Sequence, residues 1–124
     1  MLGSSFDGTN WPDCGEIDIM EYVGREPDLI IGTLHGPGYS GASGMSQWNR
    51  QEYAIADDFH TFAIEWVAGQ IDWYYDGEKY HTVTSGDLSG RQWVFDQPFF
   101  IILNLALGGT LGGAIGLDTV FPAH

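Results

Sequence analysis

The chain has 124 residues, which is enough for one domain built around a single core. Lysine and arginine together number 4, against 17 aspartate and glutamate residues, so the net charge is −13. Nucleic acids and anionic membranes attract clustered cations, so this composition argues against both as partners. Aromatic residues make up 15% of the chain, and rings beside carboxylates suit a neutral polyol, whose faces stack and whose hydroxyls form hydrogen bonds.

Short strands separated by turns dominate the predicted secondary structure. A polar, glycine-rich loop over residues 3–15 precedes a strand over 15–23, and a turn leads to a second strand over 29–35. Residues 36–49 predict a further loop. The remaining expected elements, in chain order, are strands over 61–67, 70–75 and 79–84, an irregular stretch over 85–97, a strand over 99–107 and a glycine loop over 108–116.

These elements predict an all-β fold, an antiparallel β-sandwich of about six strands that forms a single domain over residues 1–124. Asp76-Gly77 predicts a two-residue hairpin turn. The stretch 99–107 is apolar on both faces except for Asn104, as in a strand buried within a sandwich. No closing strand is expected over 121–124. Four tryptophans are assigned to the core: Trp48, Trp66, Trp73 and Trp93.

The most informative segment is Glu16-Ile17-Asp18-Ile19-Met20-Glu21, which places three carboxylates in six residues of a predicted strand. Side chains of a strand alternate faces, so Glu16 and Asp18 share one face and Glu21 has the wrong parity. A β-bulge with Met20 as the extra residue would return Glu21 to the shared face. Glu16 and Glu21 are then roughly 13 Å apart at Cα, and their carboxyls could approach the ~5–5.5 Å separation of a retaining glycosidase.

Carboxylates this close cannot all ionise freely, so at least one is expected to hold a proton near neutral pH, and their titrations should be coupled. The spacing alone leaves three interpretations open. The carboxylates could perform general acid/base chemistry, ligate calcium, or protect a sheet edge from aggregation.

The segment Trp11-Pro12-Asp13-Cys14-Gly15 and the acidic motif after it closely resemble family 16 glycoside hydrolases, and among them the bacterial laminarinases, which are endo-β-1,3-glucanases. The resemblance covers essentially the whole chain in order. It continues through Gly32-Thr33-Leu34-His35-Gly36-Pro37-Gly38-Tyr39-Ser40-Gly41, Asp58-Phe59-His60-Thr61-Phe62-Ala63-Ile64-Glu65-Trp66, Ile71-Asp72-Trp73-Tyr74-Tyr75-Asp76-Gly77 and Pro98-Phe99-Phe100-Ile101-Ile102-Leu103-Asn104-Leu105-Ala106-Leu107-Gly108-Gly109.

The resemblance implies a β-jelly-roll sandwich of the concanavalin A-like lectin/glucanase type, with a cleft across its concave sheet. It implies retaining hydrolysis in which Glu16 is the nucleophile, Asp18 a helper that tunes it, and Glu21 the acid/base. Met20 places the chain with the bulged form of the family motif. No cofactor is required, and no metal is expected at the catalytic carboxylates.

Three further residues are expected to bind substrate. Trp11 matches a tryptophan that lines the sugar cleft, although a core position is its alternative. His35 matches a histidine near the acid/base, and its alternative is a histidine satisfied by loop carbonyls. Asn104 is the lone polar residue of a buried strand and is expected to face the cleft.

Family members typically have about twice this length, so the jelly roll is expected to be incomplete at both ends, as in an internal fragment. A structural calcium is expected only in the full-length family domain. The expected partner is a β-glucan such as laminarin, and the expected location is extracellular, although no signal peptide opens the chain. Two alternatives are a β-glucan-binding jelly roll without turnover and an endo-hydrolase of mixed-linkage glucan or agar-type galactan.

Overall fold

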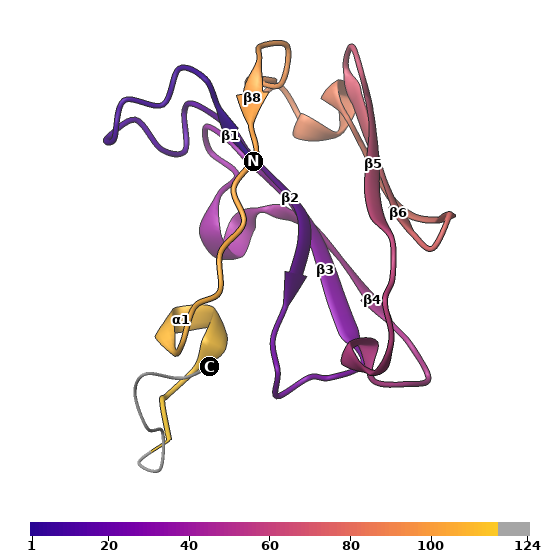
Figure 1. The fold of residues 1–124 in the computed structure, drawn as a ribbon. Helices are drawn as coiled ribbons and strands as arrows, with labels where there is room; N and C mark the ends of the chain where they lie inside the picture. The colour runs from indigo at the N-terminus through magenta and orange to yellow at the C-terminus, as the bar shows by residue number, and fades with distance from the viewer. Residues whose placement is uncertain (117–124) are drawn as a thin grey trace.

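The computed structural model describes residues 1–116, which form two antiparallel sheets (Figure 1). The larger sheet has the strand order β4-β3-β2-β1-β8 and the smaller one the order β5-β6-β7. The expected all-β jelly-roll class is therefore confirmed. The strands are β1 (Leu2–Gly3), β2 (Glu16–Tyr22), β3 (Leu29–His35), β4 (Met45–Arg50), β5 (Phe62–Val67), β6 (Gln70–Tyr75), β7 (Glu78–Thr84) and β8 (Phe99–Phe100).

The smaller sheet is an antiparallel meander, as its sequence predicts. β6 has the expected bounds, and β5 and β7 begin within one residue of theirs. Asp76 and Gly77 join β6 to β7 with φ angles of 48° and 85°, the two positive values that a type I′ hairpin turn requires. A short 3₁₀ turn at Ser85–Leu88 follows β7, within the stretch expected to be irregular; two more lie at Gly41–Ser43 and Ile55–Asp57.

The core lies between the two sheets and is built from the alternate residues of their facing strands. Ile17 of β2 and Leu34 of β3 have no exposed surface, and neither do Ile71 and Trp73 of β6. The indole Nε1 of Trp73 also donates a hydrogen bond to the backbone oxygen of Asp18 at 2.9 Å. This bond ties the smaller sheet to the middle of β2, beneath the acidic motif.

Two predicted loops contain strands. β1 lies at the start of the expected first loop, and β4 occupies the end of the stretch expected to be a loop over 36–49. β4 pairs along its whole length with β3 and forms one edge of the larger sheet. The prediction missed β4 because its residues are mostly polar and exposed, so the apolar alternation of a half-buried strand is absent.

The predicted buried strand over 99–107 is wrong beyond Phe100. β1 pairs with β8 on one side and β2 on the other, but it spans only Leu2 and Gly3. Among residues 1–116, the segment after Phe100 pairs with no strand, and Leu103 and Leu105 are 93% and 97% exposed. The expected glycine loop contains one helical turn, α1 (Gly109–Gly112). Residues 121–124, over which no closing strand is expected, lie outside the described residues.

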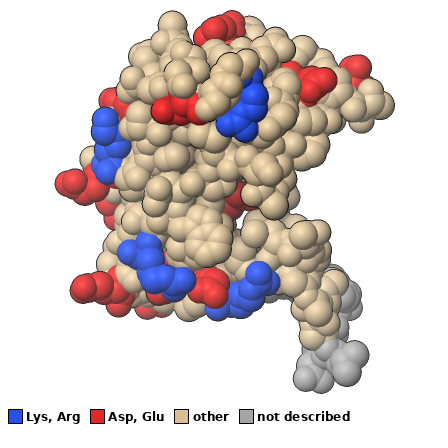
Figure 2. Space-filling model, turned by 180° about the vertical axis from the view of Figure 1, so that it is seen from behind, with Lys and Arg blue, Asp and Glu red and all other residues tan. Residues whose placement is uncertain are grey.

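Within residues 1–116, no helix has the length and apolar character needed to cross a membrane. On the face shown in Figure 2, acidic and basic side chains are interspersed and no continuous basic surface forms.

Candidate active site

The predicted β-bulge is present in the middle of β2. Asp18 lies opposite Thr33 of β3, and Glu21 lies opposite Ile31, with a register shift between the two pairs. The chain therefore advances three residues along β2 against two along β3. Ile19 and Met20 share one position opposite Gly32, and Met20 is the more exposed of the two. The extra residue corrects the parity of Glu21.

Gly32 makes room for the core beneath the bulge. A Cβ atom at this position would lie 2.6 Å from Cδ1 of Trp73 and 2.6 Å from the hydroxyl oxygen of Tyr80. Such distances are far inside van der Waals contact. Glycine therefore lets the smaller sheet approach β3 closely enough for Trp73 to reach the Asp18 backbone.

The three carboxylates lie on the face of the larger sheet that points away from the core. Glu16, Asp18 and Glu21 alternate with the buried Ile17, and their cross-strand partners are His35, Thr33 and Ile31. Thr33 Oγ1 donates a hydrogen bond to Glu21 Oε2 at 3.3 Å, which places the Glu21 carboxylate above the strand pair that also carries Asp18. We call this surface the carboxylate face.

Trp11 covers the Glu16 end of the carboxylate face. Its indole Nε1 donates a hydrogen bond to Glu16 Oε2 at 2.6 Å, and its ring meets the His35 ring edge-on with 6.0 Å between centroids. The side chain is 43% exposed, so it retains open ring surface and does not take the core position considered as its alternative. The predicted loop before β2 thus positions the Trp11 indole against the Glu16 carboxylate.

His35 connects Asp18 to the end of β3. Its Nε2 lies 3.2 Å from Asp18 Oδ2, and the side chain is almost buried. A Cβ at Gly44 would lie 2.6 Å from the imidazole, so the loop before β4 packs directly against the ring. His35 Nδ1 is buried and neither accepts nor donates a hydrogen bond within the described residues. Its polar partner is therefore a carboxylate and not a loop carbonyl.

Burial and mutual repulsion govern the charges of the cluster. Burial, and next the charge of Asp18, raise the pKa of Glu16 above its ordinary range, against the opposing effects of the Trp11 hydrogen bond and of His35. Burial and the charge of Asp18 likewise raise the pKa of Glu21, against the hydrogen bond from Thr33. Burial alone would lower the pKa of His35, but its bond to Asp18 and the three nearby carboxylates raise it overall. The raised pKa values of Glu16 and Glu21 agree in direction with the repulsion expected among neighbouring carboxylates.

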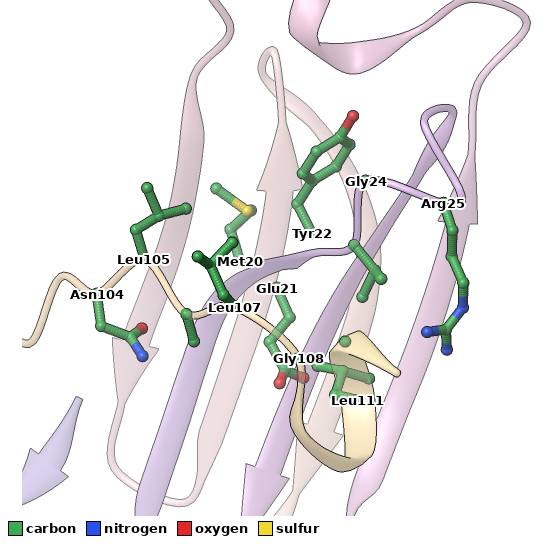
Figure 3. Close-up of a pocket in the computed structure, with 13 residues that line it drawn as sticks. Met20, Glu21, Tyr22, Gly24, Arg25, Asn104, Leu105, Leu107, Gly108 and Leu111 are labelled. Carbon is green, nitrogen blue, oxygen red and sulfur yellow. The ribbon is translucent and has the colours of Figure 1, made fainter. Parts of the chain in front are cut away.

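A groove of about 670 Å³ opens beside Glu21, between the end of β2 and the segment after β8 (Figure 3). β2 and the turn after it supply one wall, and Asn104, Leu105, Leu107, Gly108 and Leu111 contribute to the other. The groove lies where β1 no longer separates β2 from the chain that follows β8. Asn104 lines this groove from an exposed, irregular segment, so it shares a cavity with Glu21 but does not stand on a buried strand.

Three residues of the carboxylate face escaped the sequence prediction. Thr33 and Ser46 join their hydroxyls at 3.0 Å, next to the Thr33–Glu21 bond. Trp48 was assigned to the core, which is wrong, because it is 64% exposed. It lies opposite Ile31 and therefore stands on the carboxylate face. Trp73 is fully buried, and Trp66 and Trp93 pack against the core as expected. Had β4 been recognised as a strand, its alternation would have placed Ser46 and Trp48 together on the carboxylate face.

One group of at least three acidic or histidine side chains in the described part of the chain has its potential metal-ligating atoms close together. It comprises Glu16, Asp18 and His35, whose atoms lie within 4.8 Å of one another. Within this group His35 pairs with Asp18, and Trp11 donates a hydrogen bond to Glu16 from outside it.

The fold and site define a class of protein: an antiparallel β-sandwich with an acidic cluster on the open face of its larger sheet. A model of the family described as glycosyl hydrolases family 16 matches residues 2–120. A beta-glucanase of Rhodothermus marinus is 40% identical over 127 residues, covering 97% of this chain and 44% of the relative.

Two solved structures share the fold. The endo-beta-1,3-glucanase from Pyrococcus furiosus matches with a TM-score of 0.90 and 48% identity, over 98% of this chain and 48% of that one. The laminarinase catalytic domain from Thermotoga maritima matches with a TM-score of 0.89 and 43% identity, over 97% of this chain and 50% of that one. The chain belongs to glycosyl hydrolase family 16. It spans about half the length of the relatives it matches.

Proposed function

We propose that residues 1–124 are part of a single catalytic domain that hydrolyses β-1,3-glucosidic bonds internally, with retention of anomeric configuration. The observation that carries this proposal is the bulge in β2, which sets Glu16, Asp18 and Glu21 on one face. Two glutamates four strand positions apart, with an aspartate between them, suit a double displacement, in which one carboxylate itself attacks the sugar and no room for an attacking water is needed between the two carboxyl groups in the first step.

In the first step, the Glu16 carboxylate attacks the anomeric carbon and forms a glycosyl ester, while Glu21 donates its proton to the departing oxygen. Burial raises the pKa of Glu21, which suits a group that must hold a proton near neutral pH. In the second step, Glu21 removes a proton from water, and the water oxygen displaces Glu16 from the sugar. The proton returns to Glu21, so the site is restored.

Asp18 and Trp11 are proposed to keep Glu16 ready for attack. The indole bond to Glu16 stabilises its ionised form, opposing the effect of burial. Asp18 raises the pKa of both glutamates, and His35 limits this repulsion by pairing with Asp18. The open part of the Trp11 ring is proposed to stack on a sugar, and Asn104 to contact substrate from across the groove beside Glu21.

The proposed substrate is a β-1,3-glucan such as laminarin, met outside the cell. Both solved structures above carry names for this class of activity, and the low content of basic residues suits a neutral polysaccharide. Family 16 enzymes generally need no cofactor, and no step above uses one. A structural calcium is proposed only for a longer family domain, because the acidic group in the described residues already serves as the proposed catalytic site.

The proposal is tested by reducing-end release from laminarin, lichenan and agarose in parallel, with the Glu16→Gln variant as control. Laminarin should be cleaved fastest, the released sugar should retain its β-configuration by NMR, and Glu16→Gln should abolish release while still binding oligosaccharide. Unchanged hydrolysis by Glu16→Gln would reject the nucleophile assignment. Binding of laminarin by the parent chain without any hydrolysis would favour a glucan-binding jelly roll instead.

A further inference from the structure

Trp48 is an exposed tryptophan on the outer strand of the larger sheet. It lies in the middle of β4, and its side chain is 64% exposed. Met45, three residues earlier on the strand, packs against the core and has the opposite parity. Trp48 therefore belongs to the face directed away from the core, where a large apolar side chain gains nothing from core packing.

Cross-strand register places Trp48 in the same row as Glu21. Trp48 lies opposite Ile31 of β3, and Ile31 lies opposite Glu21 of β2. The neighbouring row is Ser46, Thr33 and Asp18, and the hydroxyls of Ser46 and Thr33 are in contact on this face. Two strand spacings separate Trp48 from the Glu21 backbone, a distance of roughly 10 Å, or about two pyranose rings.

The two exposed tryptophans of the carboxylate face stand on different sides of the acids. Trp11 adjoins Glu16, at one end of the motif, through its hydrogen bond and its contact with His35. Trp48 lies level with Glu21, at the other end of the motif and displaced toward the sheet edge. A sugar chain that passes over Trp11 and the carboxylates could therefore continue across β3 and reach the ring of Trp48.

We propose that Trp48 is a sugar-stacking platform that extends the glucan-binding surface across β3 to the edge of the sheet. The proposal rests on the glucanase function proposed above and adds a specificity-determining residue to it. The ligand is a neutral pyranose, two or more units from the bond that is cleaved. An indole face offers such a ring the apolar contact that the neighbouring Ser46 and Thr33 hydroxyls cannot supply.

The test compares Trp48→Ala, Trp48→Phe and Trp48→Leu in the Glu16→Gln background, where bound sugar is not consumed. Affinities for laminari-oligosaccharides of two to six units are measured by calorimetry on the full chain. Trp48→Ala should weaken binding of the longest oligosaccharides roughly 3- to 10-fold and leave the shortest ones unaffected. Trp48→Phe should recover most of the loss, and Trp48→Leu little of it, because leucine offers area without a planar ring.

Val67→Ala provides the control, since Val67 is also an exposed apolar residue but ends β5 of the other sheet. It should leave every affinity unchanged. Equal affinities of the parent and Trp48→Ala at all lengths would overturn the platform while leaving the glucanase proposal in place. So would an oligomer that dissociates in Trp48→Ala without a change in sugar affinity. Failure of all variants to bind any β-glucan would overturn both.

Discussion

Deleting Met20 should leave all three carboxylates on one face, because the deletion removes the residue that β3 does not pair. Asp18 and Glu21 would then be two positions apart, matching the two positions between Thr33 and Ile31. Side-chain parity and cross-strand register would both be preserved without a bulge. Deleting Ile19 together with Met20 makes Glu21 the immediate neighbour of Asp18, and therefore turns it toward the core.

The structure sets the size of the two effects. Met20 is 42% exposed, so its loss removes a little over half of a methionine's burial, roughly 1–2 kcal/mol. A regular ladder restores about one backbone hydrogen bond, worth about 1 kcal/mol, so the net change in the free energy of unfolding should be within about 1 kcal/mol of zero. The double deletion directs an unpaired carboxylate toward apolar residues, and should cost about 3–5 kcal/mol.

Urea unfolding at pH 7, followed by tryptophan fluorescence, measures both free energies. Cross-strand NMR contacts between residue 21 and Ile31 report whether the register is kept. A single deletion that costs 3 kcal/mol or more, or that loses the contact with Ile31, would refute the assignment of Met20 as the extra residue. A double deletion as stable as the single one would refute the parity argument itself.

Three further changes test the site. Burial and Asp18 raise the pKa values of Glu16 and Glu21, so both carboxyls stabilise the fold fully only below about pH 4, and this stability is lost as pH rises through the raised values. Glu16→Gln and Glu21→Gln should therefore each raise the free energy of unfolding at pH 7 by about 0.5–2 kcal/mol. This gain should be absent at pH 3, where the parent carboxyls are protonated. Gly32→Ala should cost about 1–3 kcal/mol in urea unfolding, because its methyl group meets Trp73; a change near zero would contradict the close packing. Trp11→Phe should raise the pKa of Glu16 in a carboxyl NMR titration, because the indole bond to the ionised form is lost, and an unmoved titration would show that this bond is weak in solution.

The acidic motif was predictable because strand parity is a strict local rule. Three acids in six residues of a β-favouring run require one extra residue if they are to act together, and the register between β2 and β3 contains that residue. The Asp76-Gly77 hairpin was predictable for a similar reason, since positive φ angles at two successive positions leave few alternatives to this residue pair.

The features that the sequence did not reveal depend on neighbours that are distant in the chain. β4 is polar and exposed, so only its pairing with β3 identifies it as a strand. The run after Phe100 looks like a buried strand, but within the described residues it pairs with no strand and is exposed. Trp48 was misassigned for the first of these reasons, because a residue has no face until its strand is known.

The bulge also explains why the site depends on the opposite sheet. A bulge interrupts the ladder between β2 and β3, so the backbone near Asp18 is held less firmly by its own sheet. Trp73 of β6 supplies a hydrogen bond to the Asp18 oxygen from 55 residues away, and it can do so only because Gly32 carries no side chain. The carboxylate face is thus fixed from beneath by the core, which allows its upper surface to remain open to the proposed substrate while the spacing of Glu16 and Glu21 stays constant.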